Sequence, residues 1–202
     1  MFKTYFARSG IFLKKYQKLN IEGTILDEEQ LQKHLQRMAM QYTLKSKSDK
    51  TTYPIPSLID NYLEIKKVYN LLNEHIKLGI NIYPAGEWIL DNFYIVEEVV
   101  RQIQKEMTIK KYTNFIGIQN GEYAGFARIY VLANLEKYLQ AYQSKKTLNM
   151  DEIWNIGIFL QIAIIQNIAE ICEKIYNAQM QKYKVKNIIE RLVEKKAKNE
   201  LK

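Results

Sequence analysis

The sequence predicts an all-α protein, a multi-helix bundle of about six helices with no sheet. Glycine (8) and proline (3) are scarce among the 202 residues, whereas a β-sandwich needs many tight turns. Apolar residues recur at spacings of three and four, the period of a helix with one buried face. One run, residues 153–172, is apolar almost all round. This run is therefore predicted to be the buried centre of the bundle.

Two helices are expected before the first prolines. Residues 3–19 have an irregular, helix-like apolar spacing. Residues 27–30 read as a capping box, in which Asp27 caps the first turn and Gln30 reaches back. Apolar residues at spacings of four and three then form one face of the second helix: Leu31, Leu35, Met38 and Tyr42. The polar stretch 46–52 is expected to end this helix.

The third and fourth helices have the clearest pattern. The apolar stripe of the third runs from Leu58 to Ile76, and Gly79 follows where a left-handed cap is expected. The fourth begins at Pro84, since proline suits a first helical turn, and its apolar face runs from Ile89 to Met107. A second row beside that face predicts contact with more than one neighbour: Trp88, Asn92, Ile95 and Val99.

The last third of the chain is predicted to hold two more helices. Residues 108–123 read as a loop, and residues 124–143 as a weakly patterned fifth helix. The sixth begins at a capping box, residues 149–152, and residues 150–176 form the central buried helix. Its body is long enough to cross a membrane, but polar residues interrupt it and favour a core helix. Three of these are expected to fix helix register or to line a ligand groove: Gln161, Gln166 and Asn167.

The low cysteine content favours a reducing, cytoplasmic compartment. We expect one helical domain, residues 1–180, followed by a basic helix or linker, residues 181–202. Residues 173–202 hold nine Lys/Arg against four Glu, and this excess of five positive charges is most of the net charge of +8. A solvated helix end is favoured there over nucleic acid or anionic lipid as a partner. Cys172 excludes an intrachain disulfide because it is the only cysteine, and it is expected to pack as a small hydrophobe.

No catalytic residue, metal site or cofactor site is predicted. The two histidines, His34 and His75, are expected at the surface, and no phosphate-binding loop or nucleophile elbow is present. Glu87, Asp91 and Glu98 share one stripe of the fourth helix, opposite its apolar face. A solvated face is the favoured interpretation, because sugar hydrolysis needs two carboxyls facing each other across a cleft.

Two segments resemble cyclic β-1,2-glucan synthases. Residues 84–98, PAGEWILDNFYIVEE, resemble the P-x-x-E-W-[LI]-L-D-N-[FY]-x-[LIV]-[LIV]-E-E stretch near the start of those proteins. Residues 128–133, RIYVLA, then residues 141–143, AYQ, and residues 148–168 resemble a second block, R-[IV]-Y-x-L-A … A-Y-Q … L-x-x-x-E-[LI]-W. The order and the approximate spacing of the two segments agree with the family.

The resemblance implies a helical N-terminal module of a very large protein that also has a nucleotide-sugar glycosyltransferase domain, membrane helices and a phosphorylase-like region. None of the transferase's catalytic or metal-binding motifs has a counterpart here. The chain departs from the family pattern L-R-x-A-L-I-E-N, because Gln161 and Gln166 stand where relatives have Arg and Glu. The chain also has fewer residues than members of that family between the positions of Ala133 and Leu135.

Three hypotheses follow for function. The first is a non-catalytic scaffold or interaction domain whose partners are the glycosyltransferase and other domains of the parent protein, with only indirect contact with the membrane. The second is a carbohydrate-binding or carbohydrate-processing domain that takes a glucan. The third, nucleic-acid binding through the lysine-rich tail, is not favoured. The ligand site of the second hypothesis consists of Glu87, Trp88, Asp91 and Asn92.

Overall fold

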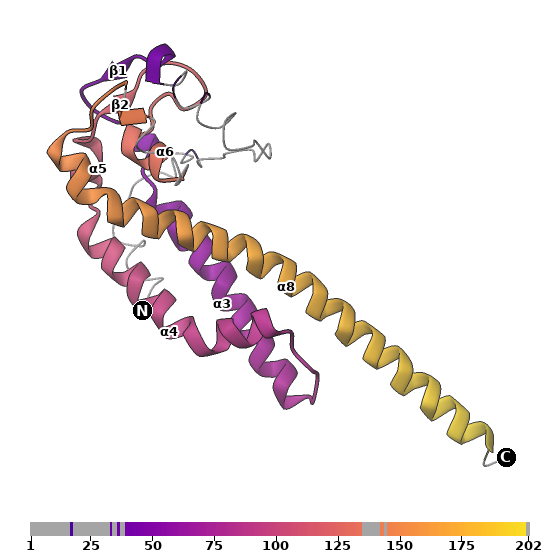
Figure 1. The fold of residues 1–202 in the computed structure, drawn as a ribbon. Helices are drawn as coiled ribbons and strands as arrows, with labels where there is room; N and C mark the ends of the chain where they lie inside the picture. The colour runs from indigo at the N-terminus through magenta and orange to yellow at the C-terminus, as the bar shows by residue number, and fades with distance from the viewer. Residues whose placement is uncertain are drawn as a thin grey trace. The chain divides into compact units, whose positions relative to one another are not determined.

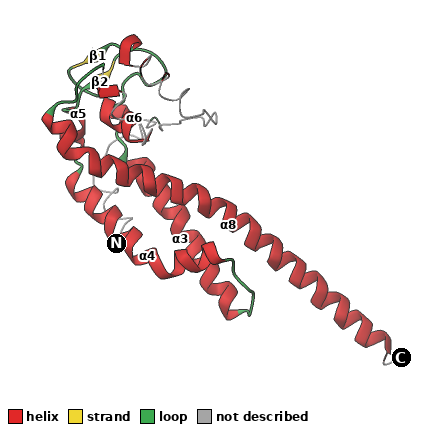
Figure 2. Ribbon diagram, viewed as in Figure 1, coloured by secondary structure: helices red, strands yellow, loops and turns green. Residues whose placement is uncertain are grey.

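The computed structural model describes residues 17, 33, 36, 39–134, 142, 143 and 145–200 (Figure 1). The all-α prediction is confirmed, since the long elements are the helices α3 (Ile55–Lys77), α4 (Pro84–Glu106) and α8 (Met150–Glu200) (Figure 2). The predicted helix 3–19 and most of the helix expected after residue 27 lie outside the described residues, although residues 39–41 are helical.

The chain divides into two compact units, which are described separately. Unit 1 comprises Met1–Ser57 and Ile103–Ala163, and unit 2 comprises Leu58–Gln102 and Ile164–Lys202. The division falls inside α3, α4 and α8, so each of these helices contributes residues to both units. The predicted boundary at residue 180 stays a prediction, and α8 is continuous across it.

Unit 1 contains a small sheet that the sequence does not predict. Strand β1 (Leu44–Lys45) pairs antiparallel with β2 (Gly117–Ile118), with Leu44 opposite Ile118. Strands of two residues have no room for an alternating pattern, so no periodic signal marks them. The expectation of no sheet is therefore wrong in detail, although the fold class holds.

The predicted loop 108–123 also contains a short helix, α5 (Ile109–Thr113). The side chain of Thr108 caps it by accepting a hydrogen bond from the backbone N–H of Lys111 at 3.2 Å. The fifth helix predicted at 124–143 is observed as α6 (Arg128–Asn134), and residues 142 and 143 are helical again. Five residues are too few to repeat a helical period, which explains why the sequence pattern missed α5.

A buried tyrosine organises the core of unit 1. Tyr112 is fully buried, and its hydroxyl lies 2.9 Å from the hydroxyl of Thr52, in the 3-10 helix η1 (Lys50–Thr52), and accepts from the N–H of Ala127 at 3.1 Å. The hydroxyl of Ser48 donates to the carbonyl of Tyr112 at 2.7 Å. Its backbone N–H donates to the carbonyl of Thr108 at 2.9 Å, so every polar group of this tyrosine has a partner, as burial requires.

Unit 2 is built on the two stripes that the sequence predicts for α3 and α4. Leu58, Ile65 and Leu72 of α3 are fully buried. On α4, the ring of Phe93 stacks against that of Tyr69, with 4.2 Å between centroids, and its neighbours on the apolar face are also buried: Ile89, Val96 and Val100. A helix pattern with a period of 3.6 residues thus identified the buried faces of both helices, except at the end of the α3 stripe, where Ile76 is 52% exposed.

The turn between α3 and α4 has the predicted left-handed glycine. Gly79 has φ +63°, its N–H donates to the carbonyl of Ile76 at 2.9 Å, and the N–H of Ile80 donates to the carbonyl of His75 at 2.9 Å. These two bonds form a Schellman motif, which satisfies the last carbonyls of α3. Pro84 then occupies the first position of α4, as predicted.

Helix α8 is not buried all round, which corrects the prediction of a central core helix at 150–176. Phe159, Ile162, Ile165, Cys172 and Ile175 are buried, but several large apolar side chains of the same run are 42–74% exposed: Ile153, Trp154, Ile164 and Ile171. A helix with apolar residues on every side is buried only where other elements cover it. In the described residues, the rest of each unit covers only part of the circumference of α8.

Candidate functional site

The predicted ligand site lies at the start of α4, beside the α3–α4 turn. Close packing fixes this corner, because a Cβ on Gly86 would lie 3.1 Å from the side chain of Leu72. An open depression of about 760 Å³ follows the turn, and its lining includes apolar and acidic groups: Ile76, Gly79, Ile80, Asn81, Ile82, Glu87, Leu90 and Asp91.

The structure brings together two of the four predicted site residues. Glu87 and Asp91 are exposed and both line the depression, one helical turn apart. Trp88 is 50% exposed, and the side-chain amide of Asn92 donates to the carbonyl of Trp88 at 2.8 Å. Trp88 and Asn92 are not among the lining residues, so the four side chains form two adjacent rows rather than one closed site.

Three carboxylates of α4 form a solvated face, as predicted. Glu87, Asp91 and Glu98 are all exposed, and Tyr94 between them is 66% exposed. The depression has no third carboxylate among its lining residues, so no opposing acid or base faces Glu87 and Asp91 within the described residues. The described ranges also hold no cluster of three His, Cys, Asp or Glu side chains suited to a metal ion. The arrangement suits hydrogen bonding to hydroxyl groups better than proton transfer.

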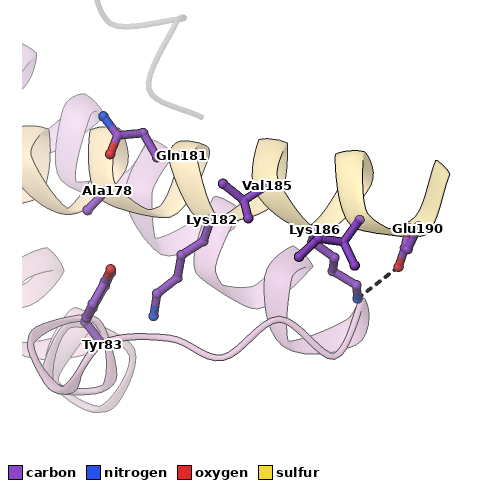
Figure 3. Close-up of a pocket in the computed structure, with 8 residues that line it drawn as sticks. Tyr83, Ala178, Gln181, Lys182, Val185, Lys186 and Glu190 are labelled. Carbon is purple, nitrogen blue, oxygen red and sulfur yellow. Dashed lines mark ion pairs between the residues drawn. The ribbon is translucent and has the colours of Figure 1, made fainter. Parts of the chain in front are cut away.

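A second groove of about 580 Å³ lies in unit 2, along α8 (Figure 3). The ammonium group of Lys182 lies over the ring of Tyr83 at 3.3 Å from its centroid and also donates to the carbonyl of Asn81 at 3.3 Å. The ammonium group of Lys186 donates to the carbonyl of Leu78 at 2.6 Å. The sequence predicted these lysines only as members of a basic tail, but they connect α8 to the α3–α4 turn.

His75 is buried, which corrects the prediction of a surface histidine; His34 lies outside the described residues. The imidazole of His75 is 3% exposed, stacks on Tyr183, and lies 3.4 Å from the amide nitrogen of Gln179. Burial lowers the pKa of His75 below its ordinary value. The side-chain oxygen of Gln179 has no hydrogen-bond partner among the described residues. The partners of His75, Tyr183 and Gln179, both come from α8, and Gln179 is 104 residues away, so the charged residues around His75 gave no signal of its burial.

An ion pair is buried in unit 1. Arg128 of α6 is 3% exposed and Glu152 of α8 is fully buried, and the Nε of Arg128 donates to Glu152 at 2.9 Å while its Nη2 contacts the other oxygen. Burial by itself would lower the pKa of Arg128, but the hydrogen bonds and the charge of Glu152 outweigh it and raise that pKa.

Glu152 also completes the predicted capping box of α8. Its carboxylate accepts from the N–H of Asn149 at 2.9 Å, and its own N–H donates to the side chain of Asn149 at 2.8 Å. Arg128 and Glu152 both belong to the segments that resemble glucan synthases, and here they hold α6 against the start of α8. Their role in this structure is therefore architectural.

The other polar candidates in α8 are not buried. Asn167 is exposed, and Gln161 and Gln166 are partly exposed, so the predicted role in core register or groove lining is not observed. Cys172 is fully buried, as predicted, and burial raises the pKa of its thiol to about 11. Helix α8 contains an 18-residue window, within Met150–Lys196, apolar enough to cross a membrane, and 33% of that window is buried in the structure.

Comparison with known proteins adds one relative. The chain is 22% identical over 147 residues to the cyclic beta-(1,2)-glucan synthase NdvB of Rhizobium meliloti (strain 1021). The match covers 66% of this chain and 5% of that protein, so the chain spans a small part of the relative's length. No family model and no solved structure matches the chain. The similarity supports a relationship to the synthase, in agreement with the two resembling segments.

Proposed function

We propose that this chain is a non-catalytic helical interaction domain that works beside the glycosyltransferase of a cyclic β-1,2-glucan synthase. The observation that carries the proposal is the similarity of two thirds of the chain to a short part of such a synthase. A segment this short is better suited to be an accessory domain than to catalyse the whole synthesis by itself. The same relationship favours a place on the cytoplasmic side, at the inner face of the membrane through the parent protein.

The geometry of the carboxylates agrees with this role. Transfer from a nucleotide sugar needs a clamp for the diphosphate and a positioned base for the acceptor hydroxyl. Glu87, Asp91 and Glu98 share one exposed helical face, and no basic side chain lines the depression beside Glu87 and Asp91. Interaction, rather than turnover, is the function that these side chains support.

The test compares the same tagged chain purified from two hosts. From a host that makes no β-1,2-glucan, the chain incubated with UDP-glucose and Mg²⁺, or with β-1,2-glucan, is expected to give no product. From its own cells, the chain is expected to co-purify with an activity that incorporates UDP-glucose into β-1,2-glucan. Turnover by the first preparation that disappears in Glu87→Gln, but persists in the matched variant Glu98→Gln, would overturn the proposal.

A second candidate function is glucan binding at the start of α4. The favouring observation is that Glu87 and Asp91 line one depression, with the half-exposed ring of Trp88 on the adjoining row. Carboxylates accept hydrogen bonds from sugar hydroxyls, and an exposed indole offers an apolar plane for a sugar ring. In a Trp154→Phe background, β-1,2-glucan should change the fluorescence of Trp88 and raise the melting temperature. Asp91→Asn should abolish both effects, and Glu98→Gln should leave both unchanged.

A further inference from the structure

The part of α8 in unit 2 has a heptad repeat. Ile164 and every seventh residue after it form one row, and Ile168 and every seventh residue after it form a second row, offset from the first by four and three residues. This is the a/d pattern of helices that pack side by side. The first row is Ile164, Ile171, Ala178, Val185 and Leu192, and the second is Ile168, Ile175, Lys182 and Ile189.

The two rows, which we call the α8 seam, differ in burial. Within the second row, Ile175 is only 6% exposed, and Lys182 is held by Asn81 and Tyr83. The first row faces outward. Its large members are 47–60% exposed: Ile164, Ile171, Val185 and Leu192. Ile189, at the end of the second row, is also exposed. Half of a helix-pairing surface is therefore uncovered by the described residues.

The groove of Figure 3 lies at the middle of the seam. Ala178 and Val185 of α8 line it together with Tyr83 from the α3–α4 turn. Ile189 is a further apolar lining residue. The small side chain of Ala178 leaves space between its larger neighbours along the row. The hollow of about 580 Å³ is also lined by Gln181, Lys182, Lys186 and Glu190, but its apolar lining can accept an inserted apolar side chain, as in knobs-into-holes packing.

The period of the exposed row identifies a helix, rather than a flat surface, as its counterpart. Residues seven apart on a straight α-helix drift by about 20° per heptad. Over the four heptads from Ile164 to Leu192, a strict repeat therefore winds around α8 by about 80°. A partner helix follows this winding by supercoiling, whereas a bilayer surface does not.

The charges beside the seam indicate the chemistry of the partner. In a coiled coil, the positions that flank the seam set partner choice through interhelical ion pairs. The ten flanking positions between residues 165 and 195 hold no Asp or Glu, and three of them hold lysine. Lys174 and Lys195 are exposed, whereas Lys186 already donates to the carbonyl of Leu78 and lies 3.8 Å from the carboxylate of Glu190. A second copy packed parallel and in register would place Lys182 of the seam against its own counterpart. The surface therefore disfavours self-pairing and favours an acidic partner.

We propose that the α8 seam docks an amphipathic helix with apolar residues at its a and d positions and Asp or Glu at the flanking positions. The partner's carboxylates pair with the exposed Lys174 and Lys195, and one of its apolar side chains enters the hollow beside Ala178. This inference rests on the proposed role as an interaction domain and gives that role a surface and a partner chemistry.

The test uses the full chain and two synthetic helical peptides of four heptads. Both peptides have Ile and Leu at a and d; one has Glu at the flanking positions and the other has Lys. Titration calorimetry is expected to show binding of the Glu peptide and binding about tenfold weaker, or none, for the Lys peptide. The double variant Val185→Ser/Leu192→Ser should lose at least about tenfold in affinity for the Glu peptide.

The matched control is Ile95→Ser, which makes the same kind of change at a 43% exposed side chain of α4. It should bind the Glu peptide as the unsubstituted chain does, and circular dichroism should confirm that both variants keep their helix content. Affinity unchanged in the double variant would overturn the proposal. So would failure of the Glu peptide to bind at millimolar concentration, binding to anionic vesicles in its place, or a dimer of the chain that the double variant abolishes.

Failure of this test and failure of the proposed function are distinguishable. A seam that binds no acidic helix leaves the co-purification result with glucan synthase activity unaffected. Conversely, turnover by the isolated chain would overturn the non-catalytic role while leaving the peptide titration unchanged.

Discussion

The buried pair of Arg128 and Glu152 makes a sharp prediction about unit 1. Glu152→Gln keeps a side chain that can still accept from the N–H of Asn149, so the capping box survives. It removes the negative charge that compensates the guanidinium of Arg128, which is 3% exposed. The perturbation therefore isolates the ion pair from the helix cap.

The magnitude follows from burial. Removing one partner of a buried ion pair costs about 3–5 kcal/mol, because the other charge is left uncompensated. Glu152 is fully buried and contacts Arg128 through both oxygens, so the upper half of that range is expected. The double variant Arg128→Met/Glu152→Met removes both charges and should be more stable than Glu152→Gln. The neighbouring Asp151 is exposed, so Asp151→Asn should change stability by only about 0.5 kcal/mol or less.

The two tryptophans provide a separate signal for each unit. Trp154 lies in unit 1 and Trp88 in unit 2, so Trp88→Phe leaves a reporter of unit 1 alone. Urea unfolding followed by Trp154 fluorescence then gives the free energy of unfolding of that unit in each variant. A loss below about 1 kcal/mol in Glu152→Gln is what an exposed ion pair gives, and that result would refute the reasoning from burial.

Three further predictions concern unit 2. Because burial lowers the pKa of His75, the folded state favours the neutral imidazole. The stability that depends on this neutral form should be full above about pH 6.5 and should be lost as the pH falls below that value. Urea titrations of a Trp154→Phe variant should show this slope, and His75→Gln should remove it. Cys172, with a pKa of about 11 and no exposed surface, should react with Ellman's reagent far more slowly in the native protein than in urea. Gly79→Ala should destabilise by about 1 kcal/mol because φ is +63°, and Gly79→Asn by less; equal losses would contradict the left-handed cap.

The candidate site was only half predictable. An i, i+4 spacing places Glu87 and Asp91 on one face whatever surrounds the helix, and both line the depression. Trp88 and Asn92 were grouped with them because they are neighbours in sequence, yet they occupy the adjoining row. The groove along α8 was not predicted, because Tyr83 and Lys182 come together only when α8 packs beside the α3–α4 turn.

The sequence by itself determined where α8 begins and where α3 ends, because these caps are made by residues within one turn. The reciprocal bonds between Asn149 and Glu152, and the left-handed Gly79, need no distant partner. Tertiary structure alone decided which side of α8 is buried, since a run that is apolar all round offers every side equally. It also decided the fate of polar groups: His75 is buried beside Gln179, 104 residues away, and Arg128 meets Glu152 across 24 residues. Local hydrogen bonds are set by spacing along the chain, whereas burial depends on which surfaces distant segments leave open to water.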